Sequence, residues 1–112
     1  MQTDSLMAQL ASDRLAGESW LKQQQTLLTH FQAEKDWQSA ATIAGVLFAA
    51  LPFDPQIAHT SAALWLRAND AATASYYARQ ATTLGPDNTD YMLTLAECQF
   101  KTDQAQNAMS TL

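Results

Sequence analysis

The sequence predicts an all-α fold in which one extra N-terminal helix precedes an array of antiparallel helix pairs. Two observations predict it. The 112 residues include only three glycines and three prolines against 47% apolar residues, which favours helices over a turn-rich β fold. Apolar side chains also recur at helical spacing along several stretches, and some of these stretches echo each other 34 residues apart.

The first element is an amphipathic helix over residues 1–17, which we expect to end at Gly17. Its apolar side consists of Leu6, Met7, Leu10 and Leu15. The spacing of these side chains over about two and a half turns indicates a helix with one face to cover.

Residues 18–112 are expected to form three helix pairs, over 18–54, 55–86 and 87–112, the last pair being incomplete. Short polar stretches interrupt the helical spacing near the middle of each pair. These stretches are Glu34-Lys35-Asp36, Asn69-Asp70 and Thr102-Asp103. Asn tolerates the left-handed conformation that ends a helix, and Asp can cap the next helix. We therefore expect a turn inside each pair.

Small residues recur in fixed columns when the chain is shifted by the 34 residues that separate Pro52 from Pro86. The columns are Ala40, Ala74 and Ala108, and Leu28, Ala62 and Ala96. Two helices joined by a tight turn approach closely only where the side chains at their crossing are small. The columns favour a repeated unit, and the alternative is an ordinary helical bundle whose periodicity is partly chance.

These columns resemble the tetratricopeptide repeat (TPR). The family places a small residue at its eighth position, an aromatic at the eleventh (here Phe31 and Trp65), Ala at the twentieth and Pro at the thirty-second. Over residues 21–112 the chain departs from this pattern at three kinds of position. Leu28 is large, Gln99 replaces the third aromatic, and Lys35, Asn69 or Asp103 stands in place of the usual turn glycine. The resemblance implies a curved array with a concave groove.

The TPR resemblance implies that the first helix of each pair lines this groove and binds a protein partner. The corresponding residues are Gln25, Thr29, Gln32, His59, Ala63, Leu66, Arg67, Leu93, Glu97, Phe100 and Lys101. We expect apolar pockets near Leu66, Leu93 and Phe100. The lining lacks the Lys and Asn set with which one TPR branch clamps acidic C-terminal tails, so an extended client segment with apolar anchors is favoured.

Two further stretches, "LFAALPFDPQ" from Leu47 and "LAECQFKTDQAQNAMSTL" from Leu95, resemble the class II chaperones of type III secretion translocators. This resemblance implies a non-enzymatic bacterial chaperone for virulence proteins that holds an apolar segment of a secretion substrate in the cytoplasm before export. The alternative function is a structural TPR scaffold or adaptor that stays in a multiprotein assembly.

The chain is shorter than these chaperones, which leaves three interpretations. It is a fragment, a related small chaperone for a needle or export component, or a protein whose open C-terminal end is covered by a partner. A homodimer through the N-terminal helix or through the uncapped C-terminal end is also expected, since an uncapped apolar end favours association. The N-terminal helix could alternatively pack back on the first pair.

Composition excludes several classes of partner. The net charge is -5, and no basic run could neutralise phosphates, which argues against nucleic acid and anionic membranes. The longest apolar stretch, from Ile43 to Phe53, is short of the ~20 residues that a membrane span needs, and we expect no signal peptide. A single cysteine excludes an internal disulfide and fits the cytoplasm.

Nothing in the sequence predicts catalysis, a metal or a cofactor. Cys98 has no His or second Cys nearby and is expected to pack inside the fold. His30 and His59 lack a ligand partner at helical spacing, so His59 either touches the client or is a surface histidine. There is no Gly-rich phosphate loop, nucleophile motif or paired-carboxylate spacing, and the acidic residues at predicted helix ends fit capping.

Overall fold

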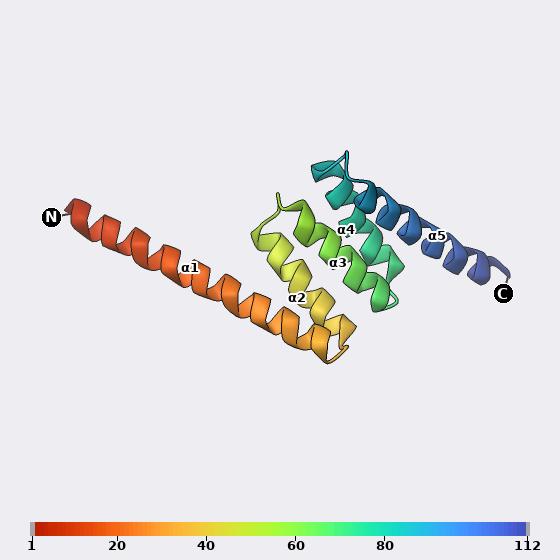
Figure 1. Ribbon diagram of the computed structural model, residues 1–112, viewed down its shortest axis with the longest axis horizontal. Coiled ribbons are helices and arrows are strands. Elements are labelled where there is room, and N and C mark those ends of the chain that lie inside the picture. Colours follow the sequence, from red (N-terminus) through yellow and green to blue (C-terminus); the bar gives the residue numbers. More distant parts are fainter. Residues whose placement is uncertain (1, 112) are drawn as a thin grey trace.

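The computed structural model describes the backbone of residues 2–111 and the side chains of residues 16–104, and over this part of the chain it contains five helices and no strand (Figure 1). The helices are α1 (Gln2–Ala33), α2 (Trp37–Ala50), α3 (Pro55–Arg67), α4 (Ala71–Leu84) and α5 (Thr89–Thr111). The predicted all-α fold class is confirmed.

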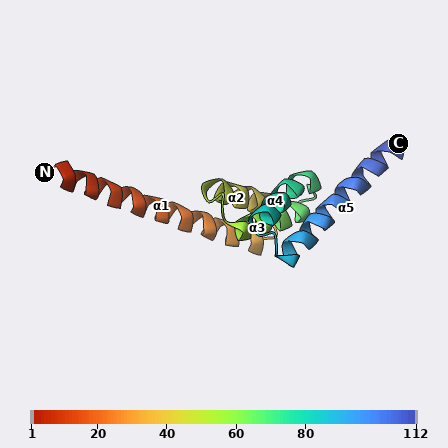
Figure 2. The same cartoon turned by 90° about the horizontal axis from the view of Figure 1, so that it is seen from above.

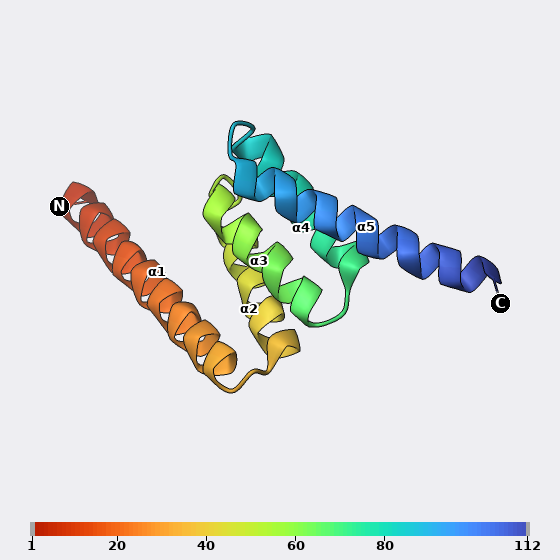
Figure 3. The same ribbon diagram turned by 45° about the vertical axis from the view of Figure 1, so that its right-hand side comes forward.

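The helices pack in the order in which they occur along the chain. Each contacts the next, and α3 also contacts α5. Short turns reverse the chain between neighbours, so α2, α3 and α4 lie side by side with alternating direction (Figure 3). Helices α1 and α5 reach beyond this central layer toward opposite ends, which gives extents of 71 × 32 × 23 Å (Figure 2).

The turn between α3 and α4 shows why the chain reverses there. Asn69 has a left-handed backbone with a φ of 64°, which Asn tolerates better than most residues. The next residue, Asp70, caps α4: the backbone N–H of Thr73 donates to one carboxylate oxygen (3.0 Å) and the Thr73 hydroxyl to the other (2.8 Å). The equivalent residues of the α1–α2 turn are Lys35, Asp36 and Ser39.

The predicted third turn at Thr102-Asp103 is wrong, because α5 continues through both residues to Thr111. The missing turn has a local cause. Gln104 occupies the position at which Asp36 and Asp70 cap the second helix of the earlier pairs. Glutamine is a poor N-cap residue, so nothing stops α5 and starts a new helix here.

The predicted end of the N-terminal helix at Gly17 is also wrong. Helix α1 runs without interruption from Gln2 to Ala33, so the extra helix and the first helix of the first pair are one element. A lone glycine costs a helix only about 1 kcal/mol, and its neighbours Ala16 and Glu18 are good helix formers. Leu6, Met7, Leu10 and Leu15, predicted to form the apolar side of the helix over residues 1–17, lie outside the described side chains.

Fully buried alanines form most of the core. Ala62, Ala74 and Ala78 pack with Cys98 and Leu66 between α3, α4 and α5. A second cluster joins α2 to α3 and consists of Ala40, Ala41, Ala44 and Leu64. A third cluster has one residue from each of α2, α3, α4 and α5, namely Phe48, Ala58, Ala81 and Tyr91. The expected burial of Ala40 and Ala74 at helix crossings is thus confirmed, while the Ala108 side chain lies outside the described ones.

Candidate protein-binding groove

Two adjoining hollows lie on either side of α3. The first, of about 360 Å³, opens between α3 and α5, and the second, of about 440 Å³, opens between α3 and the α1–α2 turn. Ala63 and Arg67 line both, so we treat the hollows as one surface and call it the α3 groove. Its residues are Gln32, Trp37, His59, Thr60, Ala63, Leu64, Leu66, Arg67, Thr94, Glu97 and Lys101.

Most of the residues predicted to bind a partner meet in this groove. Those brought together are Gln32, His59, Ala63, Leu66, Arg67, Glu97 and Lys101. The remaining predicted residues are exposed and line neither hollow: Gln25, Thr29, Leu93 and Phe100. Four further residues line the groove and were not predicted from the sequence: Trp37, Thr60, Leu64 and Thr94. Thr60, Leu64 and Thr94 each directly follow a predicted groove residue in the sequence. This adjacency is the signal from which they could have been predicted.

Arg67 is fixed at the centre of the groove by an aromatic ring. Its guanidinium carbon lies 4.7 Å from the centroid of the Trp37 ring, within the range of a cation–π interaction. The side chain is otherwise exposed, at the last turn of α3. Arg67 therefore lies against Trp37 and lines both hollows of the groove.

The rim on α5 carries an ion pair between Lys101 Nζ and Glu97 Oε1, at 3.6 Å. Both side chains are about half exposed, so the pair contributes little to folding stability. With Arg67, the groove has two cations and one carboxylate, although the whole chain carries a net charge of -5. The groove is thus a locally basic surface on an acidic protein.

His59 links α3 to α5. Its Nε2 is hydrogen-bonded to the Thr94 hydroxyl at 2.8 Å, and its ring centroid lies 4.9 Å from that of Tyr91. The Tyr91 hydroxyl in turn donates to Gln56 Oε1 at 3.3 Å. The contacts of His59 within the chain hold two groove-lining helices together, in addition to placing the imidazole at the edge of the second hollow.

The three residues near which apolar pockets are expected, Leu66, Leu93 and Phe100, lie in different surroundings. Leu66 is only 9% exposed, because it packs into the cluster that contains Ala62 and Cys98. Leu93 and Phe100 are highly exposed on α5 and line neither hollow of the groove. Ala63 lines both hollows; the lining of the first hollow is mainly polar, whereas that of the second is mainly apolar.

Cys98 is fully buried, as expected for a packing residue. Burial raises the pKa of its thiol above the ordinary value, and the neighbouring Glu97 carboxylate raises it further. The thiolate is the reactive form, so we expect Cys98 to react with a thiol reagent at least about tenfold more slowly in the folded protein than in urea. Equal rates measured by absorbance would contradict this burial.

The raised pKa of Cys98 also has a consequence for stability. As the pH rises past the ordinary thiol pKa of about 9.0, the unfolded chain loses this proton before the folded chain does. The stabilisation of the folded state by the protonated Cys98 thiol is therefore complete at neutral pH. It is lost progressively as the pH rises in alkaline solution.

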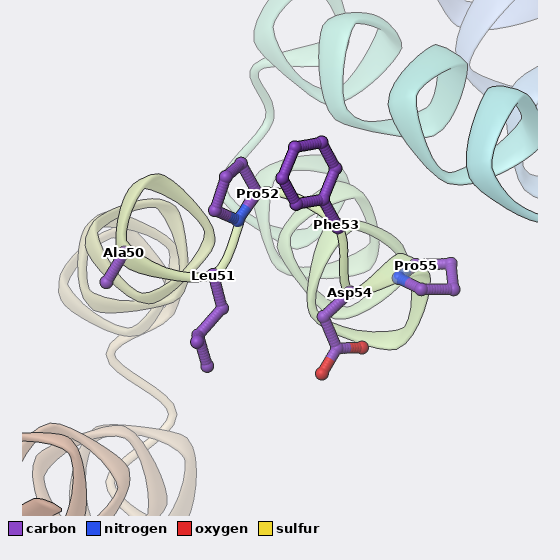
Figure 4. Close-up of a pocket in the computed structure, with 6 residues that line it drawn as sticks. All are labelled: Ala50, Leu51, Pro52, Phe53, Asp54 and Pro55. Carbon is purple, nitrogen blue, oxygen red and sulfur yellow. The ribbon is translucent and has the colours of Figure 1, made fainter.

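A separate hollow lies at the turn between α2 and α3, lined by Ala50, Leu51, Pro52, Phe53, Asp54 and Pro55. Asp54 caps α3 and Pro55 starts it, which sets the path of the turn. Figure 4 shows the Phe53 ring directed to the opposite side from Leu51 and Asp54. With 84% of its surface exposed, Phe53 is a candidate partner contact that was not among the residues predicted from the sequence.

No cluster of three or more His, Cys, Asp or Glu side chains that could hold a metal ion occurs in the described part of the chain. None of the described helices combines the length and the apolar character needed to cross a bilayer.

Fold and site together define an all-α protein with a groove along α3 that carries Arg67, Lys101 and Glu97 and has one mainly polar and one mainly apolar hollow. Comparisons of the chain with protein-family models, with curated proteins and with solved structures found no match.

Proposed function

We propose that this chain is a non-enzymatic binding protein whose helix pairs stack like tetratricopeptide repeats and whose α3 groove holds a segment of a client protein. The observation that carries the proposal is the meeting, in one groove, of side chains from α1, α3 and α5 at positions that the repeat pattern assigns to the inner surface. The two capped turns, repeated 34 residues apart with left-handed Lys35 and Asn69, also support the repeat.

The groove chemistry suits a particular kind of client segment. Arg67 and Lys101 can donate charge-assisted hydrogen bonds to a carboxylate, and Arg67 is already oriented by Trp37. The small Ala63 lines both hollows, and the second hollow has a mainly apolar lining that suits apolar side chains of the client. We therefore propose a client segment in which acidic groups alternate with small apolar residues.

The proposed activity is that of a chaperone for type III secretion, acting in the bacterial cytoplasm. Binding would cover a client segment that otherwise associates too early. Release would follow when the export machinery competes for the same segment. This mechanism requires only binding and dissociation, without a chemical step.

Charge reversal at the centre of the groove tests the proposal. The chain is co-expressed with the products of its neighbouring genes, and any complex is purified and its affinity measured by calorimetry. Arg67→Glu is expected to weaken client binding at least about tenfold, because it replaces an attraction for client carboxylates by repulsion. The matched control is Arg79→Glu on α4, another exposed arginine, which lines neither hollow.

Unchanged affinity of the Arg67→Glu variant would reject the α3 groove as the binding surface. The same complexes separate a chaperone from a scaffold. A chaperone loses its client on export, so size-exclusion chromatography after export recovers the free chain. A scaffold remains with its partner in the finished assembly.

A further inference from the structure

The first hollow of the α3 groove contains a carboxylate of its own chain beside two cations. Glu97 and Lys101 lie one turn apart on α5, and Arg67 lies in the last turn of α3. The other residues that line this hollow are uncharged: Ala63, Leu66 and Thr94. Two cations and one carboxylate leave an excess of one positive charge, so Glu97 halves the positive charge that the hollow presents to a partner.

The ion pair of Glu97 with Lys101 is easily opened. The two charged atoms are 3.6 Å apart, whereas a strong charge-assisted hydrogen bond between nitrogen and oxygen is about 2.7–2.9 Å long. Water reaches both partners, because their side chains are 47% and 55% exposed. Exposed pairs of this kind contribute little to stability, so another carboxylate can replace Glu97 at Lys101.

The same ion pair has no part in assembling the groove. Both partners belong to α5, so the pair joins no two helices. The side-chain hydrogen bond that joins α3 to α5 at this hollow is the one between His59 and Thr94, and it does not involve Glu97. Removal of the Glu97 charge should therefore leave the groove in place.

A client carboxylate that enters the hollow meets Glu97 as well as the two cations. Glu97 opposes its binding in two ways. It is already paired with Lys101, and it places a like charge in the same hollow, which disfavours the complex. A basic client side chain is not favoured instead, because Arg67 and Lys101 together outweigh the single carboxylate.

We propose that Glu97 is a competitor within the chain: it occupies Lys101 in the free protein and is displaced when a client carboxylate binds. This inference rests on the proposed function of the α3 groove and assigns to Glu97 a role opposite to that of Arg67. Glu97 lowers the affinity for the client and so favours its release, while the surplus of positive charge still selects acidic segments.

The test removes one charge from the protein and, separately, the charges from a defined probe. The probe is a fluorescein-labelled peptide in which glutamate alternates with alanine and leucine, and its partner has glutamine in place of every glutamate. Fluorescence polarisation measures the affinity of both peptides for the full chain. Glu97→Gln is expected to bind the glutamate peptide at least about threefold more tightly, because the competing carboxylate is gone. Its affinity for the glutamine peptide is expected to stay the same.

The matched control is Asp103→Asn, which removes one negative charge from an exposed position of the same helix that lines neither hollow. We expect it to change either affinity by less than about twofold, since salt screens an exposed charge outside the groove. Circular dichroism checks that both variants keep their helix content.

Three results would overturn the role of Glu97. They are weaker or unchanged binding of the glutamate peptide by Glu97→Gln, an equal gain for both peptides, and no preference of the unmodified chain for glutamate over glutamine. None of them decides the proposed function, which is rejected only if Arg67→Glu leaves the affinity for the co-expressed client unchanged.

Discussion

Replacing Tyr91 by alanine is expected to lower the free energy of unfolding by about 3–5 kcal/mol, the range found for deleting a buried aromatic side chain. Tyr91 is 6% exposed and packs among Phe48, Ala58 and Ala81. Its hydroxyl also donates to Gln56, and its ring contacts His59. The substitution therefore removes the contacts that attach the first turns of α5 to the preceding helices.

Urea denaturation followed by circular dichroism measures this loss. The control is Tyr76→Ala, the same change at a tyrosine that is more than half exposed on α4. We expect it to cost less than about 1 kcal/mol, because most of the ring is already in water. Equal losses at the two tyrosines would contradict the placement of Tyr91 in the core and with it the attachment of α5.

Replacing Ala74 by leucine is expected to cost about 1–3 kcal/mol, because the crossing of α3 and α4 has no room for a larger side chain. Ala74 is fully buried against Ala62, Ala78 and Cys98. Leucine is a good helix former, so loss of stability would come from packing and not from helix propensity.

The control for this prediction lies two residues earlier in the same helix. Ala72 is exposed, so Ala72→Leu is expected to change the free energy of unfolding by less than about 0.5 kcal/mol. Thermal unfolding of the two variants makes the comparison. If both behave alike, the buried alanine column does not mark a close helix crossing, and the repeat interpretation loses its physical basis.

Much of the local architecture could be predicted from the sequence. The turn at Asn69-Asp70 follows from the tolerance of Asn for left-handed backbone and from the capping ability of Asp. The same reasoning predicted a turn at Thr102-Asp103 and was wrong there. The residue that decides the outcome is Gln104, one position after the predicted break, where a capping carboxylate is absent.

The groove could be predicted only in part. Ala63, Arg67 and Glu97 line the groove and were predicted from the positions that the resemblance to the tetratricopeptide repeat implies for the inner surface. Leu66 and Phe100 were expected to be equivalent pocket residues, yet one is in the core and the other is exposed. Spacing along a helix identifies a face, but it does not state whether another helix lies against that face.

The amino-acid sequence on its own determined helices α2, α3 and α4, the turns capped by Asp36 and Asp70, and the column of small residues. These features depend on interactions within a few residues along the chain, namely backbone conformation, caps and helical spacing. Only the tertiary structure decided that His59 bonds Thr94 and that Arg67 lies over Trp37. Those outcomes depend on which helix packs against which, and this is set by contacts between segments distant in the chain.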